Sequence, residues 1–247
     1  MLSIFRKKTR IPIDLSGLRC DMHSHLVPGV DDGAPDLFTS IELIRGLYDI
    51  GYRKVITTPH IMWEMYKNTH DNIVAGAQQV RSRLLEEEIP VEFSAAAEYF
   101  MDEHFDLLLK SDEPLLTIKD NMVLVEFSFI RQPIELKEIL FRMQIKGYQP
   151  VIAHPERYHY FATHKNWFDE IREIGCLFQL NILSLGGFYG KQASELASYL
   201  IRKKYIDFIG TDLHNARHLQ VMHNAENPIM EGVLKLLDSG ILQNATL

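Results

Sequence analysis

Histidine and carboxylate side chains recur in this sequence at the ends of short apolar segments. The first example is the pair His23 and His25, which follows the apolar stretch that begins at Leu18. Side chains two residues apart point to the same face of a β-strand, so the two imidazoles could bind one metal ion together. An isolated His-x-His is common by chance and is weak evidence for a metal site. The interpretation therefore depends on whether other segments supply further ligands.

Later segments of the chain end on the same types of side chain. These residues are His60, Glu98, Glu126, His154, Asp212 and His214, and the loop after His25 adds Asp31 and Asp32. Imidazole nitrogen and carboxylate oxygen, without thiolate, suit manganese, iron, zinc or cobalt at a hydrolytic centre. A carboxylate such as Glu98 could bridge two ions, and so many ligands need more than one ion.

The segments that carry these residues are predicted to be strands that alternate with helices. The predicted strands cover residues 18–23, 54–58, 91–97, 122–126, 150–153, 177–181 and 206–211, and the predicted helices cover 36–48, 72–88, 134–146, 167–174 and 194–203. Strands that alternate with helices of this length indicate parallel β-α-β units. Closed into an α/β barrel, such units place functional residues at the carboxyl ends of the strands. Periodicity does not distinguish this barrel from an open doubly wound sheet.

The composition is that of a globular protein with a sizeable core. The chain has 247 residues, of which 46% are hydrophobic and 24% charged, and α/β barrels of this size form one domain. We expect an N-terminal tail of residues 1–17 and a single domain of residues 18–247. Residues 1–10 are basic but lack the apolar core of a signal peptide, and no apolar run reaches the roughly 18 residues of a membrane span. We therefore expect a cytoplasmic protein without stable membrane insertion.

Charge and cysteine content argue against other kinds of protein. Acidic residues outnumber basic ones, 33 to 26, and the formal net charge of −7 argues against a nucleic-acid partner. Two cysteines, Cys20 and Cys176, form neither a disulfide framework nor a zinc–thiolate site, and they fit a reducing compartment.

Several of these motifs are specific in combination. The chain contains Val-Asp-Asp-Gly at 30–33, Thr-Pro-His at 58–60, His-Pro-Glu-Arg at 154–157 and Thr-Asp-Leu-His-Asn at 211–215, besides the first His-Ser-His at 23–25. With these motifs it resembles the polymerase-and-histidinol-phosphatase (PHP) superfamily. Within that superfamily it is most similar to the bacterial metal-dependent protein-tyrosine phosphatases of capsular and exopolysaccharide clusters. The resemblance extends from about residue 21 to residue 215 and implies a distorted (β/α)7 barrel with three divalent metal ions, often manganese.

The resemblance also implies roles for individual residues. One ion would be surrounded by His23, His25, Glu98 and Asp212; Glu98 would bridge to a second ion, held with Glu126 and His154; Asp32, His60 and His214 would hold a third. Arg157 is expected to bind phosphate, and Arg217 stands nearest to the position of a second arginine found in streptococcal-type members of the family.

The implied activity is hydrolysis of phosphotyrosine on the tail of a bacterial tyrosine autokinase that controls polysaccharide synthesis. Metal ions and a forked guanidinium would meet the charge of the phosphate. A metal-bound water, with its pKa lowered toward about 7, would supply hydroxide. A thiol nucleophile is excluded on spacing, because neither Cys20 nor Cys176 is followed six positions later by arginine.

Other functions and roles are left open at this point. The alternative functions are a small-molecule phosphatase of the histidinol-phosphate type, a nuclease and a non-catalytic binding module. The sequence does not indicate whether the protein is a monomer or an oligomer. His218 is a weaker ligand candidate, Glu156 is either a supporting or a solvated charge, and the bulky segment 62–66 is either a substrate rim or a packing surface.

Overall fold

A computed structural model of the chain describes residues 13–111, 113–224 and 228–247. Most of the expected N-terminal tail, residues 1–12, therefore lies outside the described residues. None of the helices in the described ranges combines the length and the apolar character that a membrane span requires.

Nine short strands make up the sheets of the described chain. They are β1 (Cys20–Asp21), β2 (Lys54–Thr57), β3 (His60–Ile61), β4 (Glu92–Ala95), β5 (Glu98–Phe100), β6 (Met122–Glu126), β7 (Gln149–Ala153), β8 (Leu177–Asn181) and β9 (Phe208–Gly210). One sheet has the order β1-β2-β4 and the other β3-β5-β6-β7-β8-β9, and every pairing between neighbouring strands is parallel.

Two of the predicted strands, 54–58 and 91–97, are each followed by a second short strand that lies beyond the predicted end. Pro59 separates β2 from β3, since proline offers no backbone N–H to a ladder. In the same way β5 follows β4 and begins just after the predicted segment 91–97. Hydrogen bonds continue across both breaks, because Ala96 N–H donates to the carbonyl of Thr57 (2.8 Å) and Glu98 N–H to that of Pro59 (3.1 Å).

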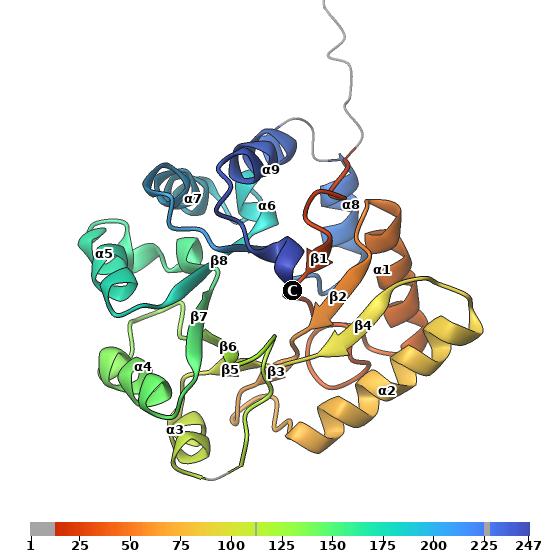
Figure 1. Cartoon of the computed structure of the whole chain (residues 1–247), viewed down its shortest axis with the longest axis horizontal. Helices are drawn as coiled ribbons and strands as arrows, with labels where there is room; N and C mark the ends of the chain where they lie inside the picture. Colours follow the sequence, from red (N-terminus) through yellow and green to blue (C-terminus); the bar gives the residue numbers. More distant parts are fainter. Residues whose placement is uncertain (1–12, 112, 225–227) are drawn as a thin grey trace, which may run out of the picture.

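The first and last strand segments lie side by side. Beyond β1 and β9, Ser24 forms a parallel bridge with Leu213, and the N–H of Asp212 donates to the carbonyl of His23 at 2.7 Å. The parallel strands therefore curl into a distorted barrel, seen nearly end-on in Figure 1. The predicted α/β barrel is confirmed, and the open doubly wound sheet is not adopted.

Helices surround the strands on the outside (Figure 1). The helices are α1 (Leu37–Asp49), α2 (His70–Glu86), α3 (Glu103–Lys110), α4 (Leu136–Ile145), α5 (Asn166–Glu173), α6 (Ile182–Leu185), α7 (Lys191–Lys203), α8 (Ala216–Asn224) and α9 (Pro228–Asp238). The five predicted helices correspond to α1, α2, α4, α5 and α7, with ends displaced by up to three residues. The helices α3, α6, α8 and α9 were not predicted from the sequence. Of these, α3 is an eight-residue helix that begins after Asp102, whose carboxylate accepts the N–H of Phe105 (2.8 Å).

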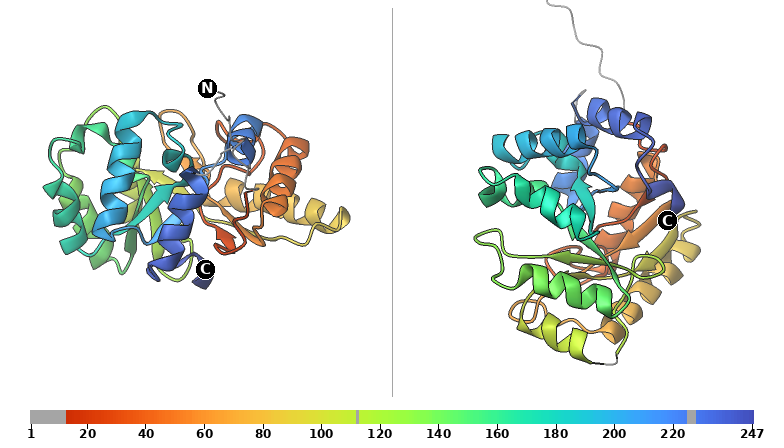
Figure 2. Two further views of the ribbon diagram at one scale, coloured as in Figure 1. Left: turned by 90° about the horizontal axis from the view of Figure 1, so that it is seen from above. Right: turned by 60° about the vertical axis from the view of Figure 1, so that its left-hand side comes forward.

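The barrel has an interior core of its own beneath the site. Met22, Leu124, Val151 and Phe208 are among its fully buried members, and the last residue, Leu247, packs against them. The short turn η3 (Asn244–Thr246) holds this end in place, since Asn244 Nδ2 donates to the carbonyls of Cys20 (3.0 Å) and Ile209 (2.7 Å). Figures 1 and 2 show the C-terminus at one end of the barrel.

A substitution of Gly210, at the end of β9, tests whether the first and last strands must approach each other closely. A Cβ atom there would lie 2.6 Å from His23 Cβ and 2.7 Å from Gln179 Nε2, both buried. We expect Gly210→Ala to lower the free energy of unfolding by about 1–3 kcal/mol, measured by urea denaturation. Gly232→Ala, within α9 and beside the flexible Leu185 methyls, is the control and should be nearly neutral. Equal stability of the two variants would contradict this close approach.

Candidate metal centre

Four ligand atoms from three strand ends meet on the floor of a cleft at the carboxyl end of the barrel. His23 and His25 follow β1, Glu98 begins β5 and Asp212 follows β9. All four side chains are buried. The contacts are His23 Nε2 to His25 Nε2 (3.3 Å), His23 Nε2 to Glu98 Oε2 (3.2 Å) and Asp212 Oδ1 (3.4 Å), and His25 Nε2 to Glu98 Oε2 (3.4 Å) and Asp212 Oδ1 (3.3 Å).

The spacing of these four atoms fits a metal ion. The five contacts of 3.2–3.4 Å match the separation of about 3.3 Å between neighbouring ligand atoms around an ion with bonds of about 2.0 Å, which is the usual length of zinc bonds to histidine nitrogen and carboxylate oxygen. Two imidazoles and two carboxylates are also a ligand set that divalent transition metals prefer. We call this group the floor quartet.

Glu98 connects the floor quartet with a second group. Its other oxygen, Oε1, lies 3.1 Å from His154 Nε2, while His60 Nδ1 lies 3.2 Å from Glu98 Oε2 and 3.0 Å from Glu126 Oε1. Neither His60 Nδ1 nor Glu126 Oε1 has a hydrogen-bond partner among the described residues, although both are buried. Buried polar atoms that converge without hydrogen bonds are a strong sign of a missing ligand, and here a cation fits.

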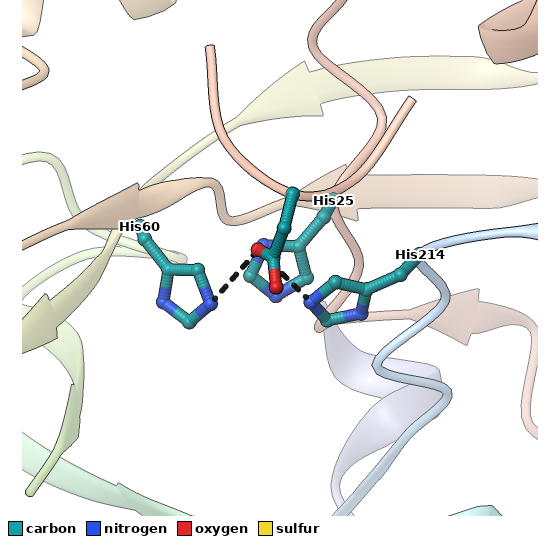
Figure 3. A group of neighbouring side chains, drawn as sticks. His25, His60 and His214 are labelled. Carbon is teal, nitrogen blue, oxygen red and sulfur yellow. Dashed lines mark ion pairs between the residues drawn. The ribbon is translucent and has the colours of Figure 1, made fainter. Parts of the chain in front are cut away.

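A third group lies at the mouth of the cleft. Asp32 Oδ1 is 3.6 Å from both His60 Nε2 and His214 Nε2, and His25 completes the group. Figure 3 shows the rings of His25, His60 and His214 turned toward one another. His60 therefore faces two groups through its two ring nitrogens, whereas the sequence prediction assigned it to the third ion alone. All nine predicted metal ligands belong to these connected groups.

Buried hydrogen bonds fix the orientation of the histidines. His23 Nδ1 donates to Gln179 Oε1 (2.8 Å) and His25 Nδ1 donates to Asp31 Oδ2 (2.8 Å). A proton on Nδ1 leaves Nε2 with a free lone pair that points into the site. The sequence reading assigned no role to Gln179, which precedes Asn181 by two residues on β8 and so shares its face of the strand.

Asp31 also organises the loop that carries Asp32. Its Oδ1 accepts the N–H of Gly33 (3.0 Å) and its Oδ2 accepts the N–H of His60 (3.0 Å). Gly33 has no room for a side chain, because a Cβ atom would lie 2.1 Å from the carbonyl oxygen of His25. One buried carboxylate thus ties the loop to two histidine-bearing strand ends.

Neighbouring histidines, and for Asp212 also Arg157, favour the ionised form of the buried carboxylates. Burial by itself raises the pKa of Glu98, but His23 and His60 hold it well below its usual value. Burial opposes ionisation of Asp212 as well, and His23, His214 and Arg157 lower the pKa of this carboxyl well below its normal range. Both carboxylates are therefore available as anionic ligands near neutral pH.

Two candidate ligands have an unusual backbone conformation. His154 has φ 32° and Asp212 has φ 51°, in the left-handed region that non-glycine residues rarely adopt. Such a conformation costs on the order of 1–3 kcal/mol and persists where the surrounding structure imposes it, often at functional sites. At both positions it follows a strand end and turns the side chain into the cleft.

Arg157 lies beside the floor quartet. Its guanidinium donates to Asp212 Oδ2 at 2.7 Å, and its Cζ lies 4.2 Å from the centre of the Tyr189 ring and 4.6 Å from that of Phe129. Asn181 Nδ2 donates to the same Asp212 oxygen at 2.8 Å. The guanidinium is thereby held in one place, and the Arg157 side chain is 20% exposed to the cleft.

Three further candidates from the sequence have different surroundings. Arg217 is exposed and is not among the described residues that line the cleft, whereas His218 does line it. Glu156 is fully buried, accepts from Ser184 Oγ (2.7 Å) and the N–H of Asn181 (3.1 Å), and supports the Asn181 that contacts Asp212. Burial raises the pKa of Glu156 to about 7.

The cleft has a volume of about 400 Å³ and an aromatic rim. Met62, Met65 and Tyr66 line it, so much of the segment 62–66 faces the site and not only the barrel. Trp63 is directed elsewhere and stacks on His104 at 4.0 Å. Both cysteines are buried, and burial raises the pKa of the Cys176 thiol to about 12, which agrees with the exclusion of a thiol nucleophile.

Comparison with known proteins gives consistent matches over most of the chain. Residues 19–231 match the model of the family described as capsular polysaccharide synthesis, CpsB/CapC. Tyrosine-protein phosphatase YwqE of Bacillus subtilis is 33% identical over 198 residues, covering 80% of this chain and 78% of YwqE. Tyrosine-protein phosphatase CpsB of Streptococcus agalactiae is 30% identical over 202 residues, covering 79% and 82% of the two chains.

Solved structures agree with these matches. A crystal structure from a study of YwqE of B. subtilis and CpsB of Streptococcus pneumoniae, described as unique metal-dependent tyrosine phosphatases, aligns with TM-score 0.77 and 30% identity. The alignment covers 92% of this chain and 90% of the other. Histidinol phosphate phosphatase of Lactococcus lactis, crystallised with zinc, L-histidinol and phosphate, aligns with TM-score 0.52 but 13% identity, and this likeness concerns the fold alone.

Asp31 tests how far the outer hydrogen bonds support metal binding. We expect Asp31→Asn to weaken binding of Mn²⁺ about ten-fold, because the histidine-orienting charge is removed while the shape is kept. Competition with a fluorescent chelator measures the affinity. Asp71→Asn, whose side chain is 99% exposed, is the control and should bind as the unaltered protein does. An unchanged affinity for Asp31→Asn would show that this carboxylate does not orient a ligand.

Proposed function

The chain belongs to the capsular polysaccharide synthesis CpsB/CapC family, and we propose that it is a metal-dependent protein-tyrosine phosphatase. The observation that carries this proposal is the position of Arg157 at 2.7 Å from a carboxylate of the floor quartet, with its guanidinium open to the cleft. A cation site next to an exposed guanidinium suits a phosphate dianion, which needs concentrated positive charge and paired hydrogen-bond donors.

We further propose that the nine clustered residues hold three divalent metal ions, with manganese as the first choice and iron, cobalt or zinc as others. The floor quartet would hold one ion. Glu98, Glu126 and His154 would hold the second, with Glu98 shared, and Asp32, His60 and His214 the third. Such ions neutralise phosphoryl charge and lower the pKa of coordinated water. The chain itself orients the ligands through Gln179 and Asp31 and presents Arg157 to the phosphate.

The aromatic surroundings favour an aryl phosphate. Tyr66, Phe129 and Tyr189 line the cleft, the last two against Arg157, and flat side chains of this kind pack well against a phenyl ring. Phenolate is also an easier leaving group than an alkoxide, because tyrosine has a pKa of about 10. The need for a strong general acid is correspondingly smaller. The likeness to histidinol phosphate phosphatase is limited to the fold and does not favour that substrate.

We infer that the physiological substrate is the phosphotyrosine-bearing tail of a bacterial tyrosine kinase of capsule or exopolysaccharide synthesis. Support comes from the family to which the chain belongs and from relatives named as tyrosine-protein phosphatases. Residues 18–247 would act as one catalytic domain in the cytoplasm.

Metal dependence separates this mechanism from thiol chemistry. The full chain with Mn²⁺ should hydrolyse p-nitrophenyl phosphate and a phosphotyrosine peptide. EDTA should lower the hydrolysis rate at least about 100-fold, and added Mn²⁺ should restore it. Iodoacetamide should have no effect, since both thiols are buried. Activity that persists in EDTA and disappears on alkylation would refute the proposal. Faster turnover of L-histidinol phosphate than of the peptide would favour the small-molecule alternative.

Arg157 should contribute through its forked guanidinium. Arg157→Ala is expected to lower kcat/KM for p-nitrophenyl phosphate about 100-fold, and Arg157→Lys to restore only part, because an ammonium cannot bind two oxygens side by side. Steady-state kinetics with a check of folding by circular dichroism measure this. The exposed Arg202 on α7 offers the control Arg202→Ala. Arg217→Ala tests the other predicted arginine, and a loss equal to that of Arg157→Ala would place both at the phosphate.

A further inference from the structure

A second groove, of about 660 Å³, lies next to the cleft that holds the candidate metal ligands. It is formed by the first turns of α3 and α4 and by the segment 128–135 between β6 and α4. Figure 1 shows α3 and α4 as neighbours, each following a strand that supplies a candidate ligand. Phe100 lines both hollows, and Phe129 of the cleft adjoins Ser128 of the groove. The groove and the cleft therefore share a wall.

Large apolar side chains at this groove are open to solvent. Ile134 is 93% exposed and Leu107 is 62% exposed, and both line the groove. Ile130, in the same segment, is 89% exposed. Apolar side chains gathered beside a site and left uncovered indicate a surface that another chain covers.

The charged side chains of the groove are mainly acidic. The carboxylates are Asp102, Glu103, Asp106 and Glu135, and the guanidiniums are Arg131 and Arg142. Arg142 pairs with Asp106 (2.7 Å) and approaches Glu135 (3.7 Å), and Lys110 also pairs with Asp106. Glu103 is exposed and has no ion pair within the described ranges. The groove thus keeps a negative excess that a basic side chain could neutralise.

We propose that this groove binds the peptide that flanks the phosphotyrosine and selects sequences with an apolar residue and a lysine or arginine near the modified tyrosine. The proposal rests on the proposed function, because a peptide is present only if the cleft takes phosphotyrosine. A tyrosine ring in the cleft brings its neighbouring residues over the shared wall at Phe100. Leu107 and Ile134 would pack against the apolar residue, and Glu103 and Glu135 would attract the cation.

A second copy of the chain suits the groove less well. In a symmetric dimer formed through this face, the two acidic grooves would meet, and like charges would oppose each other. A basic peptide meets no such repulsion. The choice of a peptide over a second copy is therefore an electrostatic one.

Two peptides and one small substrate test the proposal with the full, Mn²⁺-loaded chain. One peptide carries leucine and lysine within four residues of the phosphotyrosine, and the other carries serine and glutamate at those positions. The small substrate, p-nitrophenyl phosphate, reaches the cleft but has no flanks. We expect about 3–10-fold higher kcat/KM for the leucine–lysine peptide, mostly through KM.

Two double variants separate the apolar and the charged contributions. Glu103→Lys with Glu135→Lys should abolish or reverse the preference for lysine, and Leu107→Ser with Ile134→Ser should remove the preference for leucine. Both should hydrolyse p-nitrophenyl phosphate at the unaltered rate, since the substituted residues are exposed and outside the cleft. Glu195→Lys on α7 and Leu85→Ser at the end of α2, exposed at 65% and 80%, are matched controls.

Binding without turnover keeps the inference separate from the proposed activity. Fluorescence anisotropy measures binding of both peptides with a non-hydrolysable phosphonate in place of phosphotyrosine, and the same order of affinities is expected. Equal affinities of the two peptides, or a preference that survives both double variants, would overturn the groove proposal even if p-nitrophenyl phosphate is hydrolysed. The proposal would also be overturned, in favour of a second copy, if a groove variant changed the molecular mass in solution, measured by light scattering, but left the affinity for both peptides unchanged. If the unaltered protein hydrolyses neither p-nitrophenyl phosphate nor the peptides but still binds the two peptides with different affinities, the proposed activity is refuted and the groove proposal is not.

Discussion

The rest of the site depends on the close approach of the four ligand atoms of the buried floor quartet. Two imidazole nitrogens and two carboxylate oxygens lie 3.2–3.4 Å apart in the contacts that join them, away from solvent. Buried charge of this density is costly unless a cation compensates it. The hydrogen bonds from Gln179 and Asp31 and the left-handed backbone at Asp212 are all arranged to preserve this crowding.

The barrel brings these four atoms together by placing its first strand next to its last. His23 follows the first strand and Asp212 follows the last, nearly 190 residues later in the sequence. The Asp212 N–H joins them by donating to the His23 carbonyl. Gly210 permits that approach, and η3 covers the opposite end of the barrel, where Asn244 bonds to the first and last strands. The carboxyl ends of the strands remain open, as the cleft and the adjoining groove require.

The sequence predicted the strand segments and the clustering of His, Asp and Glu at their ends, because both depend on local patterns. Apolar runs that end on His, Asp or Glu gave the strand segments and eight of the nine clustered residues, and the loop after His25 gave the ninth, Asp32. Asp36 indicated the start of α1, since its carboxylate accepts the N–H of Thr39. The four-residue α6 is too short for periodicity to reveal. The role of Gln179 and the two-sided position of His60 depend on contacts between distant segments. Glu156 could not be assigned either, since only its burial beside Ser184 distinguishes it from a solvated charge.

Anomalous diffraction from crystals grown with Mn²⁺ tests the central claim most directly. The account predicts an anomalous peak enclosed by His23, His25, Glu98 and Asp212, with further peaks beside Glu126 and His154 and beside Asp32 and His214, and loss of the enclosed peak in Asp212→Ala. Crystals with full-occupancy manganese elsewhere and none between these four side chains would contradict it.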